Sequence, residues 1–161
     1  MVRAPLNVLV YPYLQVGEGA FEYALLRRAD EGWWQGVTGG AEDDETPLDA
    51  ARRETFEETG ISPDAAFLRL DTVIWVRVTH FGCSHIWGDE IYVIPMYCFG
   101  VRAPDRRIVL SHEHTECRWL PYDQALALTR FDGNRTALWE LDRRLRGLGP
   151  RDGRPPQGGT R

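Results

Sequence analysis

The stretch GGAEDDETPLDAARRETFEETGI, residues 39–61, determines how this chain folds. Thr46 and Pro47 are typical of a helix N-cap and of the first helical position that follows it. Gly60 is typical of the residue just beyond the last turn of a helix. We therefore expect an acidic loop, a helix between Thr46 and Gly60, and a second loop.

Three glutamates on this predicted helix fall on one face, because positions 54, 57 and 58 are related by i+3 and i+4 spacing. Like charges at that spacing oppose helix formation by about 0.2–0.5 kcal/mol per pair. One explanation is a site for a hard divalent cation, which binds carboxylates and bridges to substrate phosphates. The other is a solvated acidic face on which Arg53 pairs with Glu57. The helix alone leaves both explanations open.

The spacing of the whole stretch favours the cation site. From Gly39 to Ile61 it is Gly-x5-Glu-x7-Arg-Glu-Thr-x-Glu-Glu-x-Gly-Ile, which resembles the signature of the Nudix hydrolases. Thr55 stands where that signature has an aliphatic residue, and threonine is similar in size. The resemblance implies an α+β domain, an α/β/α sandwich with a mixed β-sheet that carries a loop-helix-loop motif.

The same resemblance implies a chemistry for the individual residues. The Gly39 carbonyl, Glu57 and Glu58 would hold Mg²⁺, with Mn²⁺ as the alternative metal. Glu54 would be a further ligand or the base for the attacking water. Arg53 would orient the carboxylates by ion pairing. The chain would then be an enzyme that hydrolyses a phosphoric anhydride.

Outside residues 39–61, which we call the Nudix box, the sequence is similar to the bacterial dihydroneopterin triphosphate pyrophosphatases, also called dATP pyrophosphohydrolases. The similar stretches are residues 26–28, 34–39, 110–119 and 134–135. This resemblance implies cleavage of a nucleoside or pterin triphosphate to the monophosphate and pyrophosphate. Oxidised dNTPs such as 8-oxo-dGTP, dinucleoside polyphosphates and ADP-ribose are alternative substrates. A Nudix-like module that senses a nucleotide without cleaving it is the alternative from another class.

Residues outside the box are also candidates for the site. Glu113 is the first choice for a loop carboxylate that reaches the metal, and Glu116 is the alternative. A zinc site made by the histidines on either side of Glu113 is disfavoured, because alternate residues on an extended chain point to opposite sides. The candidate substrate-binding residues are Arg27, Trp34, Gln35 and Asn134.

The reasons for these choices differ. Arginine gives bidentate recognition of phosphate, and Arg27 and Gln35 are candidates for phosphate or base contacts. Arg28 has the opposite parity on its strand, so we expect it to be solvated. Trp34 either stacks on a base or pterin ring or packs in the core.

The composition excludes several functions. The chain has 161 residues and a formal net charge of -5, and all 19 of its basic residues are arginine. Without lysine there can be no Schiff base and no lysine-containing P-loop. A pI near 5.4 argues against nucleic-acid binding, and no apolar run is long enough for a membrane span. Three widely spaced cysteines and the lack of a signal-peptide pattern favour a cytoplasmic location.

The remaining segments complete the expected domain. The predicted strands cover residues 6–14, 21–28, 33–37, 67–79, 90–100 and 117–120, with a break at Gly39-Gly40. A second helix is predicted in the segment after Asp132-Gly133-Asn134, and Gly147 would end it. Residues 1–147 then form a single domain and residues 148–161, rich in Gly, Pro and Arg, a disordered tail. The sequence leaves open whether the protein is a monomer or a homodimer.

Overall fold

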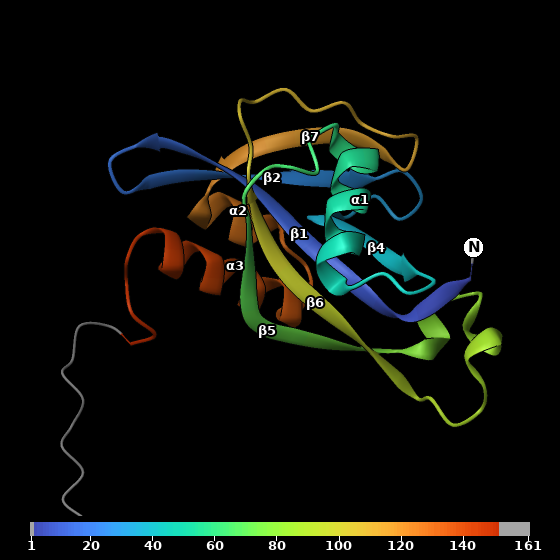
Figure 1. Ribbon diagram of the computed structural model, residues 1–161. Coiled ribbons are helices and arrows are strands. Elements are labelled where there is room, and N and C mark those ends of the chain that lie inside the picture. Colours follow the sequence, from blue (N-terminus) through green and yellow to red (C-terminus); the bar gives the residue numbers. More distant parts are fainter. Residues whose placement is uncertain (1, 152–161) are drawn as a thin grey trace, which may run out of the picture.

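The computed structural model describes residues 2–151 and has the mixed β-sheet between helices that the sequence predicts (Figure 1). The strands are β1 (Arg3–Gly17), β2 (Ala20–Arg28), β3 (Trp34–Gln35), β4 (Val37–Glu42), β5 (Phe67–Arg77), β6 (Val93–Arg102) and β7 (His114–Pro121). The helices are α1 (Pro47–Thr59), α2 (Tyr122–Leu128) and α3 (Asp132–Leu145), with short 3-10 turns η1 (Val78–His80) and η2 (Ser84–Trp87). Among the described residues, no helix is long and apolar enough to cross a membrane.

Strand β1 is the centre of the sheet. It pairs antiparallel with β2 and β4 and parallel with β6, in the order β3-β2-β1-β6-β5, while β7 pairs with β2. Its residues alternate between two cores: Val8 and Val10 pack in the cluster under α1, and Leu9 and Tyr11 pack in the cluster under α2 and α3. Residues 7–12 of the strand are buried because both of its faces are covered there. The α/β/α sandwich is confirmed.

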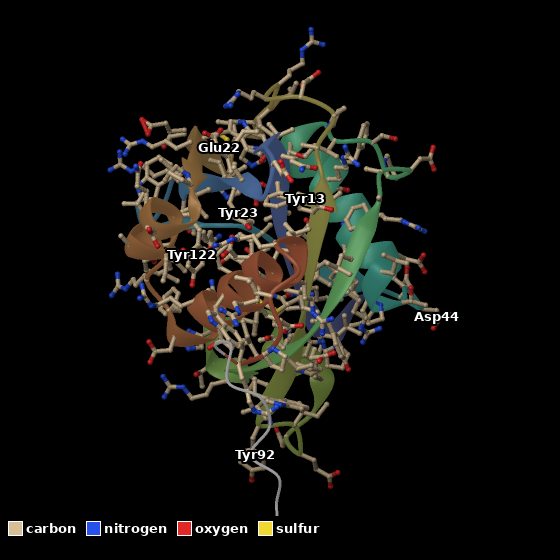
Figure 2. The ribbon with its side chains drawn as sticks, turned by 90° about the vertical axis from the view of Figure 1, so that its left-hand side faces the viewer. Tyr13, Glu22, Tyr23, Asp44, Tyr92 and Tyr122 are labelled. Carbon is tan, nitrogen blue, oxygen red and sulfur yellow. The ribbon has the colours of Figure 1, made fainter. Side chains whose placement is uncertain are left out.

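The two helical layers lie on opposite sides of the sheet. In Figure 2, Asp44 marks the acidic loop beside α1, and Tyr23 and Tyr122 lie toward the side of α2 and α3. The Tyr23 hydroxyl donates a 2.7 Å hydrogen bond to Asp142 Oδ1 of α3. This buried contact joins α3 to β2.

Helix α1 begins and ends where the sequence predicts. Thr46 Oγ1 accepts a hydrogen bond from the Asp49 backbone N–H, and the Asp49 carboxylate accepts one from Thr46 in return. Gly60 has φ 77°, a left-handed conformation that glycine adopts without strain, and its N–H donates to the Phe56 carbonyl. The capping residues therefore fix the length of the helix.

The expected break at Gly39-Gly40 is wrong. Strand β4 continues through both glycines to Glu42, because Gly39 and Gly40 pair with Val8 and Asn7 of β1. The ladder with β1 outweighs the weak intrinsic strand preference of glycine.

Other boundaries also differ from the sequence prediction. Strand β7 is longer than expected because it pairs with β2 along its length. Helix α2 has only seven residues and no side-chain cap, so it left no clear pattern in the sequence. Of the predicted tail, residues 152–161 lie outside the described part of the chain.

Strand β5 contains an irregularity that α3 compensates. Its register with β6 shifts between Arg69 and Val73, which leaves the backbone N–H groups of Asp71 and Thr72 free of the ladder. Both N–H groups donate to the Glu140 carboxylate of α3, at 2.7 Å and 2.8 Å. Burial opposes ionisation of Glu140, but these bonds and those from the Thr72 hydroxyl and Arg144 outweigh it and lower the pKa of Glu140.

We predict that Glu140→Gln lowers the free energy of unfolding by about 1–3 kcal/mol at about pH 7, because the amide offers these donors only one acceptor. A depressed folded-state pKa stabilises the protein above the ordinary value of 4.5 and ceases to do so as the pH falls through the folded value. In urea denaturation, the difference between wild type and variant should therefore close in acid. The control is Glu18→Gln, in the exposed β1–β2 turn. A difference that persists in acid would contradict the assignment.

Candidate functional site

Gly39 of β4 lies directly against Glu54 of α1. A Cβ atom added at Gly39 would lie 2.0–2.4 Å from the carboxyl atoms of Glu54. Such a contact is impossible, so only glycine lets the Glu54 carboxyl lie against the strand. The structure thus brings together two residues that lie 15 positions apart in the sequence.

Arg53 joins the acidic loop, the strand and the helix. Its guanidinium donates to Glu45 at 2.9 Å, to the Gly40 carbonyl at 2.8 Å, to Glu54 at 3.1 Å and to Glu57 at 3.3 Å. One planar group with five donors thereby fixes three carboxylates and a carbonyl. This geometry is what an orienting role requires.

The pKa of the Glu54 carboxyl lies near neutral pH. Its side chain is 13% exposed, and burial raises its pKa to about 7 even though Arg53 opposes the shift. Glu57 and Glu58 add further negative charge from the same helix face. A carboxyl in these surroundings gains from a cation beside it.

Glu58 and Glu113 meet at the other end of the site. Hydrogen bonds from His114, Glu113 and Ser111 outweigh the effect of burial and lower the pKa of Glu58. The hydrogen bond with Glu58 raises the pKa of Glu113, with burial as the second cause. Glu116, the alternative loop carboxylate, instead pairs with Arg118 at 2.9 Å on β7.

This donor set fits a hard divalent cation. Within residues 2–151, the side chains form no ready-made group of three or more His, Cys, Asp or Glu ligands. Mg²⁺ does not need one, because it keeps several waters and binds one or two carboxylates together with substrate phosphates. The carboxyl held against Gly39 and the close pair Glu58–Glu113 supply oxygen ligands of that kind.

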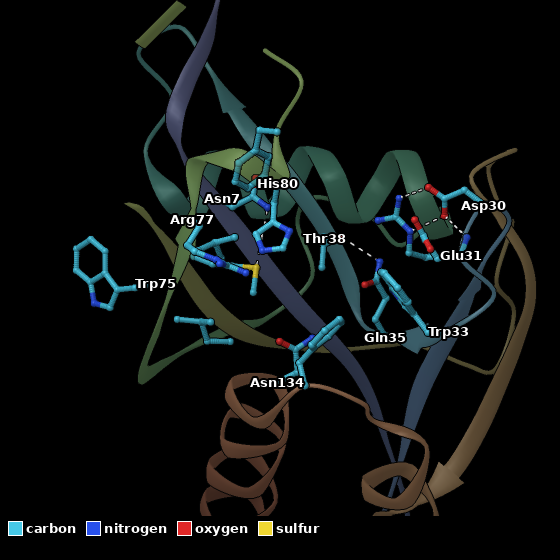
Figure 3. Close-up of a pocket in the computed structure, with 16 residues that line it drawn as sticks. Asn7, Asp30, Glu31, Trp33, Gln35, Thr38, Trp75, Arg77, His80 and Asn134 are labelled. Carbon is cyan, nitrogen blue, oxygen red and sulfur yellow. Dashed lines mark hydrogen bonds and ion pairs between the residues drawn. The ribbon is translucent and has the colours of Figure 1, made fainter. Parts of the chain in front are cut away.

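A cavity of about 520 Å³ is lined in part by β4 (Figure 3). Thr38, the residue before Gly39, lines it, whereas Gly39 and the α1 carboxylates are not among its lining residues within residues 2–151. Three buried carboxamides also line it: Asn7, Gln35 and Asn134. Gln35 Nε2 donates to Thr38 Oγ1 at 3.1 Å, which leaves Gln35 Oε1 as the acceptor.

Of the predicted substrate residues, Gln35 and Asn134 line the cavity, and Arg27 and Trp34 do not. Arg27 and Trp34 are cross-strand partners in the β2–β3 pair, so their side chains share a face. Trp34 packs in the core with the Arg118 guanidinium 4.6 Å from its ring. The exposed Arg27 donates to the Gly32 carbonyl instead.

The sequence neighbours of Arg27 and Trp34 lie at the cavity instead. Trp33 and Arg28 line the cavity, and Arg28, which we expected to be solvated, has a side chain that is 35% exposed and pairs with Asp30 at 2.6 Å. Trp33 packs edge-on against Phe131 with ring centroids 5.3 Å apart. A shift by one residue reverses the side of a strand, and the sequence alone did not fix that register.

Asn7 is a cavity residue that sequence reasoning missed. Its Oδ1 accepts a 2.6 Å hydrogen bond from Arg3 Nη2. A guanidinium has only donors, so this bond fixes the amide and turns Nδ2 away from Arg3, toward Met96 Sδ at 4.0 Å. Met96 lines the cavity, so Asn7 presents a donor there. No sequence motif indicates this role, because Asn7 lies within a strand and its position at the cavity depends on the folded structure.

Comparisons with known proteins agree with this geometry. A family model described as NUDIX domain matches residues 6–140. A dihydroneopterin triphosphate diphosphatase from Escherichia coli strain K12 is 32% identical over 140 residues, 84% of this chain and 91% of that protein. An RNA pyrophosphohydrolase from Roseobacter denitrificans is 30% identical, covering 75% and 80%. The crystal structure of a NUDIX hydrolase from Listeria monocytogenes matches with a TM-score of 0.79 and 36% identity, covering 89% and 96%. The chain therefore belongs to the Nudix family of hydrolases, enzymes that act on phosphoric anhydrides.

Proposed function

We propose that this enzyme is a Mg²⁺-dependent pyrophosphohydrolase that converts a nucleoside or pterin triphosphate to the monophosphate and pyrophosphate. The observation that carries the proposal is the Glu54 carboxyl of α1, held against Gly39, while the preceding residue Thr38 lines a cavity with buried carboxamides and aromatic rings. The name of the Escherichia coli relative supports a pterin triphosphate as the first substrate to test.

In this proposal, the carboxylates divide the work. Glu57, Glu58, Glu113 and the Gly39 carbonyl hold the metal, and Arg53 keeps the carboxylates oriented. Glu54, whose pKa is raised by burial in the metal-free site, accepts the proton of the attacking water. Mg²⁺, when bound, neutralises phosphate charge and activates water for in-line attack. Mn²⁺ has the same ligand preference and is the alternative ion.

The cavity holds the heterocycle. Trp33 provides an aromatic surface, and Asn134 and Gln35 provide hydrogen bonds to the edge of the ring. Asn7 faces a ligand acceptor, since Arg3 fixes its amide as a donor. Arg28 replaces Arg27 as the proposed phosphate or base contact, because it lies at the cavity.

A second candidate function is removal of pyrophosphate from an RNA 5′ end. The name of the Roseobacter relative favours it. The net charge of -5 argues against it, because binding to a nucleic-acid backbone gains most from a basic surface. Oxidised dNTPs, dinucleoside polyphosphates, ADP-ribose and a non-catalytic sensing role are the remaining alternatives.

A substrate screen with product identification separates these functions. The purified protein is incubated with Mg²⁺ or Mn²⁺ and dihydroneopterin triphosphate, dNTPs, 8-oxo-dGTP, diadenosine polyphosphates, ADP-ribose or a 5′-triphosphorylated RNA. We expect pyrophosphate from a triphosphate of a small heterocycle. Preferential turnover of RNA would favour the second function, and nucleotide binding without any cleavage would favour sensing.

We predict that Glu57→Gln folds normally and loses nearly all hydrolysis, because it removes a charged metal ligand. Glu57 is half exposed, with a side chain 52% accessible, so its replacement should leave the stability nearly unchanged. The measurement is kcat with Mg²⁺, next to a thermal melt. Glu116→Gln is the matched control and should keep wild-type turnover. Wild-type kcat in Glu57→Gln would refute this role.

We also predict that Gly39→Ala reduces kcat by more than about 100-fold, because the new methyl group would displace the Glu54 carboxyl. Gly82→Ala is the control, since nothing lies within 4 Å of a Cβ built there. Both variants should give far-ultraviolet circular dichroism spectra like that of the wild type. A fully active Gly39→Ala enzyme would show that the contact with Glu54 does not matter.

A third prediction concerns the heterocycle. Asn134→Ala should raise KM about tenfold, which corresponds to the loss of one hydrogen bond worth about 1.4 kcal/mol, and should change kcat little. The exposed Gln124→Ala on α2 is the control. A change confined to kcat would place Asn134 outside ring recognition.

A further inference from the structure

The loop between β6 and β7 returns to the end of α1 and is fastened there. Val109 N–H donates to the Thr59 carbonyl at 2.8 Å, and Ser111 Oγ donates to Glu58 Oε2 at 3.1 Å. The Glu113 carbonyl accepts from Ala29 N–H at 2.9 Å. These contacts hold residues 109–113 between the helix and the β2–β3 loop.

His114 completes this attachment from the first position of β7. Its side chain is 3% exposed and that of Glu58 is 5% exposed, and His114 Nδ1 lies 2.6 Å from Glu58 Oε2. Two bare acceptors would repel at that distance, so a proton lies between them, and the lowered pKa of Glu58 favours its position on Nδ1. Neither of the buried ring nitrogens makes a hydrogen bond of good geometry within residues 2–151, so Nδ1 meets Glu58 Oε2 as a close polar contact.

Two groups therefore converge on a single oxygen. Ser111 Oγ and His114 Nδ1 both contact Oε2 of Glu58. A carboxylate held through one oxygen cannot rotate freely, so the direction of its second oxygen is also fixed. The Ser111 hydroxyl additionally accepts from the Glu113 backbone N–H at 3.3 Å, which places the loop carboxylate beside Glu58.

We propose that His114, assisted by Ser111, is a positioning residue that holds Glu58 through Oε2, an arrangement that we call the clamp. The other oxygen of Glu58, Oε1, and the Glu113 carboxylate are then oriented to bind the divalent cation. This inference rests on the proposed metal-dependent function. Groups that orient a metal ligand commonly contribute 10–100-fold to metal affinity. The clamp lies about 50 residues beyond the Nudix box, so the box by itself does not specify the orientation of its last glutamate.

Metal titration of the full-length protein tests the proposal without relying on turnover. Mn²⁺ binding is measured by calorimetry and by the loss of the free-ion electron paramagnetic resonance signal. His114→Leu should bind Mn²⁺ at least about tenfold more weakly. His114→Asn, whose amide nitrogen reproduces the position of Nδ1, should stay within about threefold of wild type. The exposed neighbour His112→Leu is the matched control and should bind as wild type does.

The outcomes separate the inference from the proposed function. Unchanged Mn²⁺ affinity in a folded His114→Leu protein overturns the clamp. If that variant fails to fold, Ser111→Ala decides, and its unchanged affinity has the same meaning. A wild-type protein that binds Mn²⁺ but hydrolyses no nucleotide refutes the proposed function and leaves the clamp intact. A wild-type protein that binds no Mn²⁺ refutes both.

Discussion

The rest of the site depends on the contact between the Gly39 backbone and the Glu54 carboxyl. It requires a glycine in β4, and it requires α1 to begin at a distance set by the acidic loop, which Arg53 ties to the Gly40 carbonyl. Once helix and strand are this close, the Glu54 carboxyl lies in a narrow gap between them, and only 13% of its side chain is exposed. Electrostatic interactions in such a gap are stronger than at an open surface.

The sequence could predict those parts of the fold and the site that depend on short-range sequence patterns. The caps of α1, the spacing of its glutamates and the mixed class of the fold all follow from short-range rules. The cavity could not be predicted to the same depth, since it depends on the pairing of distant strands. Trp33 and Trp34 illustrate the limit: adjacent in sequence, they point to opposite sides, and only the β2–β3 register decides which one meets the cavity.

Buried polar groups follow a similar division. Asn7 looks like an ordinary strand residue until Arg3 is seen to hold its oxygen, and His114 looks like a loop histidine until Glu58 is seen 2.6 Å away. Both contacts connect segments that pattern reading treats separately. In a chain without lysine, arginine is responsible for several such tasks, and Arg53 and Arg3 perform them by orienting oxygen atoms rather than by binding phosphate.

The attachment of α3 to β5 has a consequence for how ligands enter. A Cβ at Gly133 would lie 2.9 Å from Ile74, and Glu140 holds the irregular segment of β5 two turns further along the helix. Helix and strand are thus joined at two points, and Asn134 and Ile74 bring both elements into one wall of the cavity. The facing wall is the short loop between β2 and β3, which carries Trp33. We expect the rates of ligand entry and release to be governed by this loop, while the opposite wall sets the shape of what fits.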